Sequence, residues 1–120
     1  IPVIAPIGIG EDFKTYNINA DIVAGKIAHI LQAGKYIILT NTTGILDTEN
    51  NLIKSINVSQ VKKLIHKKVI SNGMLPKVES ALEAVSSGVE HVQIIDGTVE
   101  HAILLELFTD EGIGTMINRL

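Results

Sequence analysis

The sequence predicts an α/β fold, a three-layer αβα sandwich in which helices cover both faces of a largely parallel sheet. Short apolar, β-branched runs alternate along the chain with segments whose apolar residues recur at helical spacing, and this alternation is typical of parallel strands joined by helices. The run at residues 36–40 is almost wholly apolar, as expected of a strand that is covered on both faces. No internal repeat, low-complexity tract or linker divides the sequence, so residues 1–120 are predicted to form one domain.

The first third of the chain is expected to contain a strand, a loop and a helix. Residues 3–7 are apolar and β-branched, which predicts a buried strand, and residues 8–12 are predicted to be a loop. Apolar residues then recur at helical spacing until Gly34, a natural helix stop. Either Asn17 or Asn19 can cap this helix, because an asparagine side chain accepts a free backbone N–H at a helix start.

The middle third is expected to alternate strand and helix in the same way. A loop at residues 41–47 follows the strand at residues 36–40, and residues 52–56 are predicted to form a short strand. Ser59 can cap a helix that ends near Lys68, because the apolar residues of this segment recur on one face.

The last third begins with a break at residues 71–73. The helix that follows carries Pro76 in its first turn, where proline is tolerated, and it is expected to stop at Gly88. The remaining predicted elements are a strand at residues 92–95, a helix at residues 99–107 and a strand at residues 112–117.

The composition argues against several classes of protein. The formal net charge is −3 and aromatic residues make up 3% of the chain, whereas nucleic-acid-binding proteins usually present a basic face and stacking aromatics. No apolar run approaches the roughly 20 residues that span a bilayer, and no signal peptide is visible. The chain has no cysteine, which excludes disulfides and thiolate metal sites. We therefore expect a cytoplasmic protein without a nucleic-acid or membrane partner.

Ligands of such sheets bind at the carboxyl ends of the strands, and Lys77 is the first candidate there. It lies in the opening turn of a predicted helix, where the positive end of the helix dipole disfavours a lysine by roughly 0.3–1 kcal/mol. A bound phosphate would reverse that cost, and Gly73 would let the backbone approach the phosphate closely. The alternative is a solvated surface lysine, and the spacing alone does not decide between the two.

Polar residues in two other segments are also candidates. Asp21 lies in the first turn of a predicted helix, where the dipole favours an acid, but it could instead hold a lysine by a charge-assisted hydrogen bond. Of Asn17 and Asn19, one is expected to cap the helix, and the other could donate to a carboxylate or phosphoryl oxygen. The Asn-Thr-Thr-Gly segment at residues 41–44 is either an ordinary turn or the border of an adenine or ribose site.

Motifs of several other enzyme classes are missing. No dinucleotide fingerprint, P-loop or Gly-x-Ser-x-Gly elbow occurs in the sequence. The four histidines show no paired spacing for a metal ion, so no protein-held metal site is predicted.

Several ordered segments resemble motifs of the N-acetylglutamate kinases, which are members of the amino-acid-kinase family. Residues 16–21 read Tyr-Asn-Ile-Asn-Ala-Asp and resemble the family's substrate-site motif. Residues 39–47 resemble its adenine-side loop, and residues 71–78 resemble the loop and helix that carry a catalytic lysine. Residues 91–97 and 107–116 resemble its C-terminal signature, so the match runs over nearly the whole chain.

The resemblance implies the amino-acid-kinase (carbamate-kinase-like) fold, of which this chain would be the C-terminal, ATP-binding part of a longer, homo-oligomeric enzyme. It implies transfer of the γ-phosphoryl group of ATP, with Mg²⁺, to the side-chain carboxylate of N-acetyl-L-glutamate in arginine biosynthesis. By motif, Lys77 and Asp21 would be catalytic, and Asn17 and Asn19 would bind N-acetyl-L-glutamate. The nucleotide would contact Lys77 together with Asn41, Thr42, Thr43, Gly44, Ile45, Leu46, Val69, Ile70, Ser71 and Gly73.

The chain also departs from the family pattern. Family members often have aspartate where Asn41 stands, and histidine where Gln93 stands. Some members are inhibited by arginine, and Glu106 and Gly112 lie where the resemblance places that site. The family's glycine-rich loop, second catalytic lysine and substrate-binding arginine have no counterpart here, so we expect this chain alone to have no kinase activity. The alternative function is a non-catalytic binding module that senses nucleotide or arginine.

Overall fold

The computed structural model describes residues 1–110 and 112–119 of the chain. This part of the chain contains four helices and six strands. None of the helices found there combines the length and apolar character needed to cross a membrane.

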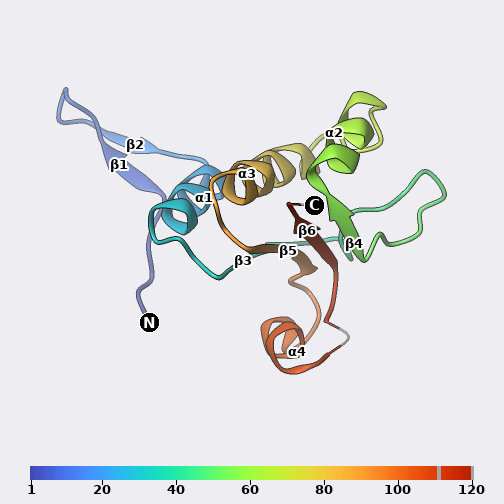
Figure 1. The fold of residues 1–120 in the computed structure, drawn as a ribbon. Helices are drawn as coiled ribbons and strands as arrows, with labels where there is room; N and C mark the ends of the chain where they lie inside the picture. The colour runs from blue at the N-terminus through green and yellow to red at the C-terminus, as the bar shows by residue number, and fades with distance from the viewer. Residues whose placement is uncertain (111, 120) are drawn as a thin grey trace.

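Four strands form the central sheet, in the order β3-β5-β6-β4 (Figure 1). β3 (Lys35–Thr40) pairs in parallel with β5 (His91–Asp96), and β4 (Ser55–Asn57) pairs in parallel with β6 (Thr115–Asn118). The central pair, β5 and β6, is antiparallel. The predicted α/β class with a mostly parallel sheet is therefore confirmed.

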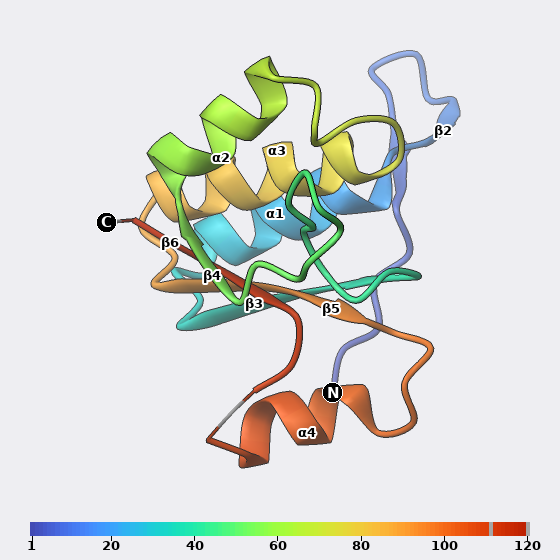
Figure 2. The same cartoon turned by 90° about the vertical axis from the view of Figure 1, so that its right-hand side faces the viewer.

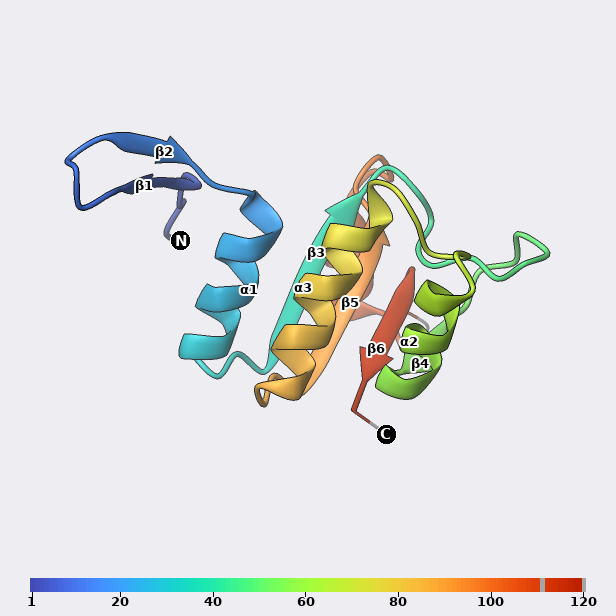
Figure 3. The same cartoon turned by 90° about the horizontal axis from the view of Figure 1, so that it is seen from above.

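Helices lie on both faces of this sheet. α1 (Ala20–Ile30), α2 (Val58–His66) and α3 (Met74–Ser86) lie on one face, and α4 (Ala102–Phe108) lies on the other (Figure 2). Seen from above, α3 lies between α1 and α2 (Figure 3). The three layers are those of the predicted αβα sandwich.

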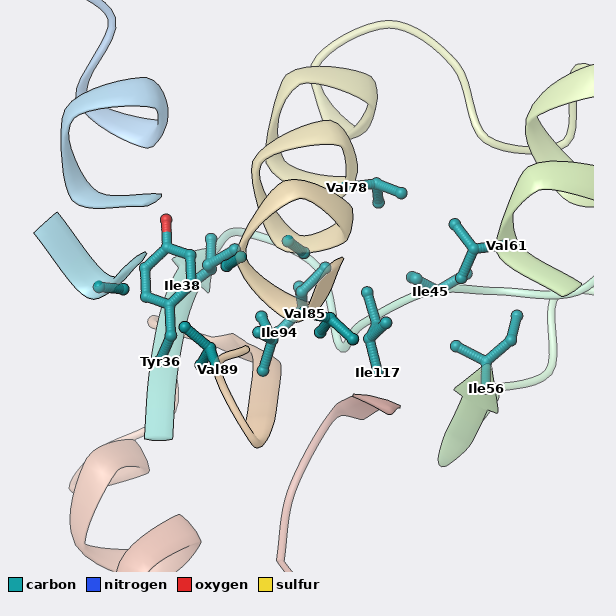
Figure 4. Packing of buried hydrophobic residues seen from close by; sticks show 14 of the residues in the cluster. Tyr36, Ile38, Ile45, Ile56, Val61, Val78, Val85, Val89, Ile94 and Ile117 are labelled. Atoms are coloured by element: carbon teal, nitrogen blue, oxygen red, sulfur yellow. The ribbon is translucent and has the colours of Figure 1, made fainter. Parts of the chain in front are cut away.

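The hydrophobic core fills the space between the sheet and the layer formed by α1, α2 and α3 (Figure 4). Val78 and Val85 of α3 are buried there together with Ile94 of β5 and Ile117 of β6. The branched side chains of the strands and the small and branched side chains of α3 thus exclude water from one face of the sheet, which is the main source of stability in such a domain.

The predicted buried strand at residues 3–7 is wrong. Val3 is 95% exposed, and the first strand, β1 (Ile7–Ile9), pairs with β2 (Thr15–Asn17) in an antiparallel hairpin outside the central sheet. The predicted loop at residues 8–12 is therefore partly strand. Apolar, β-branched residues favour a strand, but a hairpin of two short strands offers no second surface that could bury them.

The helices begin close to their predicted positions, with one cap wrongly assigned. Asn19 caps α1, and its side chain accepts the backbone N–H two residues further on at 2.8 Å. Asn57, and not the predicted Ser59, caps α2, because Asn57 and Gln60 each accept the other's backbone N–H. Pro76 lies in the first turn of α3, as predicted.

Two strand predictions also need correction. Leu39 of β3 is 46% exposed, so the run at residues 36–40 is well covered on one face only, since β3 lies at an edge of the sheet. β6 begins at Thr115 and not at residue 112, because Gly114 has a positive φ of 81°. A Cβ at Gly114 would lie 2.1 Å from the carbonyl oxygen of Ile94, so the chain makes a close backbone contact there that only glycine permits.

Candidate active site

The candidate active site is built on an ion pair between two helix N-termini. Lys77, in the first turn of α3, donates to both carboxylate oxygens of Asp21, in the first turn of α1, at 3.1 Å each. The two side chains are 24% and 19% exposed, so the pair is partly shielded from water. Both helices begin at the carboxyl-end edge of β3 and β5 (Figure 3), the edge where ligands of α/β sheets bind.

This arrangement bears on the interpretations of Lys77 and Asp21 that the sequence left open. Lys77 is not a freely solvated lysine, since Asp21 holds it at the helix end. An ammonium group has three N–H donors, and the carboxylate of Asp21 does not use all of them. The remaining donor capacity of Lys77 and the positive ends of the two helix dipoles together make a positively polarised edge that suits an anion.

The backbone of Asp21 is held as firmly as its side chain. The Ser80 hydroxyl donates to the Asp21 carbonyl oxygen at 2.6 Å, and the Tyr36 hydroxyl reaches the same oxygen at 3.3 Å. The two hydroxyl oxygens are 3.2 Å apart. Burial raises the pKa of the Tyr36 phenol, an effect that the Ser80 hydrogen bond opposes and the charge of Asp21 reinforces. The phenol therefore stays protonated, and able to donate, at neutral pH.

The two asparagines predicted to bind substrate lie next to this ion pair in the chain. Asn19 is the N-cap of α1, so its side-chain oxygen is already used by the helix. Asn17 is the last residue of β2 and is exposed. The structure thus assigns the capping role that the sequence left open between Asn17 and Asn19.

A pocket of about 210 Å³ brings together two of the predicted nucleotide loops. Residues 42–46 and 69–71 both border it, although Thr43 lines a different cavity. Asn41, Gly73 and Lys77 are not among the lining residues. The predicted residues in the lining are Thr42, Gly44, Ile45, Leu46, Val69, Ile70 and Ser71.

Three lining residues were not among the predicted nucleotide contacts, although Asp47 and Met74 lie within the motif segments at residues 39–47 and 71–78; the third is Asn50. The Asp47 carboxylate accepts the backbone N–H groups of Glu49 and Asn51 at 2.8 and 2.9 Å, and the hydrogen bond from Asn51 is the main cause of a lowered Asp47 pKa. Such a turn could have been predicted, since aspartate often accepts from the backbone two residues further on. No sequence signal marks Met74 as a lining residue.

The first of these loops is anchored to the sheet. Gly44 has φ +144°, and a Cβ on it would lie 2.6 Å from the Thr115 hydroxyl. That hydroxyl accepts the backbone N–H of Ile45 at 2.8 Å, and Leu46 forms an isolated antiparallel bridge with Leu52. The loop wall of the pocket is therefore positioned by β6.

A second cavity, of about 490 Å³, contains the two residues assigned to an arginine site, Glu106 and Gly112. Glu106 is only 6% exposed, and its carboxylate accepts from Lys35 at 2.8 Å, from the Ile113 backbone N–H at 2.9 Å and from Gln93 at 3.1 Å. Lys35 was not foreseen, because a lysine at the start of a strand carries no special signal. Glu106 belongs to α4, which lies on the opposite face of the sheet from α3 (Figure 2).

Together, the α/β fold and the helix-end ion pair form a positively polarised edge at the carboxyl ends of the strands, where α/β proteins commonly bind their ligands. The chain belongs to the amino acid kinase family, to which residues 1–96 match. Among curated relatives, it is 62% identical over 117 residues to an acetylglutamate kinase from Nitrosococcus oceani. It is 58% identical over 119 residues to an acetylglutamate kinase from Alkalilimnicola ehrlichii. The resemblance inferred from the motifs is therefore confirmed.

The chain covers only part of these relatives. The alignments include 98% and 99% of this chain but 39% of each relative. The chain thus spans about two-fifths of the length of the curated relatives that it matches.

Solved structures support the same assignment of fold. The N-acetylglutamate synthase from Neisseria gonorrhoeae, solved with coenzyme A and L-arginine, matches 96% of this chain with a TM-score of 0.88 and 31% identity, over 27% of its own length. The carbamate kinase from Giardia lamblia bound to AMP-PNP matches 92% of this chain with a TM-score of 0.70 and 20% identity, over 36% of its own length. The carbamate-kinase-like fold is therefore confirmed.

Proposed function

We propose that this chain is the nucleotide-binding part of an acetylglutamate kinase, which transfers the γ-phosphoryl group of ATP to the side-chain carboxylate of N-acetyl-L-glutamate. The observation that carries the proposal is the Lys77–Asp21 ion pair, which links the N-terminal turns of α3 and α1. The relatives named acetylglutamate kinase, which align over almost the whole chain, support this choice of substrate. Cytoplasmic location, a homo-oligomeric enzyme and a single-domain organisation stay predictions.

The proposed chemistry needs charge and position more than a protein nucleophile. In phosphoryl transfer, catalysis is mostly positioning and electrostatic stabilisation, and the carboxylate of N-acetyl-L-glutamate is itself the nucleophile. Lys77 would neutralise the transferring phosphoryl group, aided by the positive end of its own helix dipole. Asp21 would hold the ammonium group in place, while Asn17 and Asn19 would contact N-acetyl-L-glutamate beside it.

The nucleotide would enter between the two loops that border the smaller pocket. Residues 42–46 and 69–71 would enclose the adenine and ribose, and Asn41 and Gly73 would contact the nucleotide from the ends of these loops. Because residues 69–73 lead directly into α3, a nucleotide in this pocket can extend its phosphates toward Lys77.

Mg²⁺ would accompany ATP in this proposal. It usually binds nucleotide phosphates and one or two carboxylates, without a dedicated protein cage. Within residues 1–110 and 112–119, no three His, Asp or Glu side chains are grouped closely enough to hold a metal ion. The donor set of this chain therefore fits an ion that is held chiefly by the phosphates.

The decisive test places this chain within a full-length relative. The 117 matched residues of the Nitrosococcus oceani kinase are replaced by this chain, and ADP release is measured with ATP, Mg²⁺ and N-acetyl-L-glutamate. We expect turnover that depends on N-acetyl-L-glutamate and that falls by about 10²–10³ in the Lys77→Ala variant. A folded hybrid with no turnover would contradict the proposed function.

The 120-residue chain on its own is expected to give no measurable turnover in the same assay. It supplies about two-fifths of the length of its relatives. The family's glycine-rich loop and second catalytic lysine have no counterpart in its sequence. Robust ADP release by the chain alone would show that Lys77 and Asp21 suffice, and would contradict this expectation.

A second binding function is supported by the cavity that contains Glu106. We propose that this cavity binds arginine, because it presents the buried Glu106 carboxylate to a cationic group and the Lys35 and Lys54 ammonium groups to a carboxylate. The similar synthase from Neisseria gonorrhoeae was solved with L-arginine. Glu106 already accepts three hydrogen bonds, so arginine must share or displace them, and we expect weak binding.

Calorimetric titration with L-arginine tests this second proposal. Glu106→Gln keeps the shape of the side chain but removes the charge, so we expect the binding heat to disappear. Glu90→Gln, at an exposed position, makes the same chemical change away from the cavity and should leave binding as it is. No heat with the unaltered chain, or equal heat with Glu106→Gln, would show that arginine does not bind at this carboxylate.

A further inference from the structure

Two of the contacts between α1 and α3 come from residues about one helical turn apart on α3. Lys77 and Ser80 are three residues apart on α3, so they lie on the same face of that helix. Lys77 contacts the carboxylate of Asp21, and Ser80 contacts the backbone carbonyl of the same residue. One residue of α1 is thus held at its side chain and at its backbone by the same face of α3.

The Ser80–Asp21 contact is unusual in its position. In an α-helix the carbonyl of residue i accepts the N–H of residue i+4, and the second lone pair normally stays free. Here that capacity is used by the Ser80 hydroxyl at 2.6 Å, with the Tyr36 hydroxyl at 3.3 Å. Ser80 is 6% exposed and Tyr36 is 8% exposed. A buried hydroxyl without a partner costs free energy, so this network strongly favours one position of the Asp21 backbone.

A glycine makes the contact sterically possible. Gly25 lies one turn after Asp21 on α1, and a Cβ on Gly25 would lie 2.4 Å from the Ser80 hydroxyl oxygen. α1 can therefore approach α3 closely enough for this hydrogen bond because residue 25 has no side chain. The close approach of the two helices, the Ser80 hydroxyl and Gly25 thus all lie about one helical turn from the Lys77–Asp21 ion pair.

The ion pair alone would not fix Asp21. An ion pair that water partly reaches adds little stability, and Asp21 is the second residue of α1, where helices fray. A displacement of even about 1 Å in a catalytic group can have a large effect on rate. The position of the Asp21 carboxylate is thus set through its backbone.

We propose that Ser80 and Tyr36 are positioning residues that fix the Asp21 backbone, and through it hold Lys77 in the orientation that grips nucleotide phosphate. This inference rests on the proposed nucleotide function of Lys77. Neither hydroxyl contacts the nucleotide in this proposal. Gly25 provides the space that the arrangement requires.

Calorimetry on the 120-residue chain separates positioning from general packing. Dissociation constants are measured for ATP with Mg²⁺ and for adenosine, which has no phosphate. In the Ser80→Ala and Tyr36→Phe variants we expect the ATP constant to rise about threefold to tenfold, the range of one lost hydrogen bond, and the adenosine constant to stay the same. Ser86→Ala, at an exposed position of α3, is the matched control and should change neither constant.

A double variant tests whether Ser80 acts through its hydrogen bond or only through its packing against Gly25. Gly25→Ala should destabilise the chain, because its methyl group overlaps the Ser80 hydroxyl. Gly25→Ala combined with Ser80→Ala removes the overlap, so we expect thermal stability to recover. ATP affinity should stay as low as in Ser80→Ala, because the hydrogen bond is still missing. Recovery of both stability and ATP affinity would show that Ser80 acts only through packing.

A nucleotide-free readout keeps this inference separate from the proposed function. NMR exchange of the Lys77 ammonium protons reports the ion pair directly, and we expect the Ser80→Ala variant to exchange severalfold faster than the unaltered chain. Equal exchange, or parallel changes in ATP and adenosine affinity, would overturn the positioning role. If Lys77→Ala leaves ATP affinity unchanged while Ser80→Ala still speeds exchange, the nucleotide function is wrong and the positioning of the ion pair stands.

Discussion

Replacing Lys77 by alanine is expected to abolish the thermal stabilisation that ATP gives to this chain. A ligand at 100-fold excess over its dissociation constant stabilises the folded state by about 2.7 kcal/mol, which corresponds to roughly 10 °C for a domain of this size. The Lys77 ammonium group and the N-terminus of α3 converge on one edge of the sheet, so removing the charge removes the main attraction for the phosphates. Thermal unfolding followed by circular dichroism, with and without ATP and Mg²⁺, measures the shift.

The matched control removes another ion pair between the same two helices. Lys26 of α1 pairs with Glu83 of α3, and the two side chains are 56% and 54% exposed. Lys26→Ala therefore deletes a lysine and an interhelix ion pair but leaves the helix N-termini intact, and the ATP shift should persist. If Lys77→Ala retains the shift of the unaltered chain, the ammonium group does not hold the phosphates and the proposed function loses its main support.

Much of this site could be predicted because the relevant signals are local. The position of Lys77 in the first turn of a helix follows from Pro76 and the apolar spacing after it, and the position of Asp21 follows from the asparagine cap before it. The alternation of strands and helices then brings the two helix ends to one edge of the sheet. The contact between Lys77 and Asp21 was one of two open interpretations, and the structure contains it.

What could not be predicted depends on contacts between distant segments. Strand direction is one case, because the apolar pattern of residues 112–117 is the same whether β6 runs parallel or antiparallel to β5. The exposure of Val3 is another, because an apolar run does not reveal whether a second surface covers it. The pairing of Lys35 with Glu106 spans 71 positions of sequence, and the hydroxyl of Ser80 looks like any serine in a helix until Gly25 is placed against it.

Gly114→Ala, directly before β6, is expected to be the most destabilising single-methyl addition among the glycines of the described residues. Gly114 has φ +81°, a region that side chains with a Cβ rarely adopt. The new Cβ would lie 2.1 Å from the carbonyl oxygen of Ile94 and 3.0 Å from the Cα of Ile95. Both are backbone atoms of fully buried residues of β5, so they cannot move aside as a flexible side chain would. We expect a loss of about 3 kcal/mol or more in the free energy of unfolding, measured by urea denaturation.

Gly34→Ala provides the control, because it adds the same methyl group where nothing lies within 4 Å and where φ is not in the left-handed region. It should be neutral, or more stable by up to about 1 kcal/mol, through the smaller entropy of the unfolded chain. The contrast also bears on the pocket, since Gly114 precedes Thr115, whose hydroxyl anchors the loop at Ile45. A Gly114→Ala variant as stable as Gly34→Ala would mean that residue 114 does not lie against the Ile94 carbonyl as closely as the structure has it, and that the turn before Thr115 does not require a glycine.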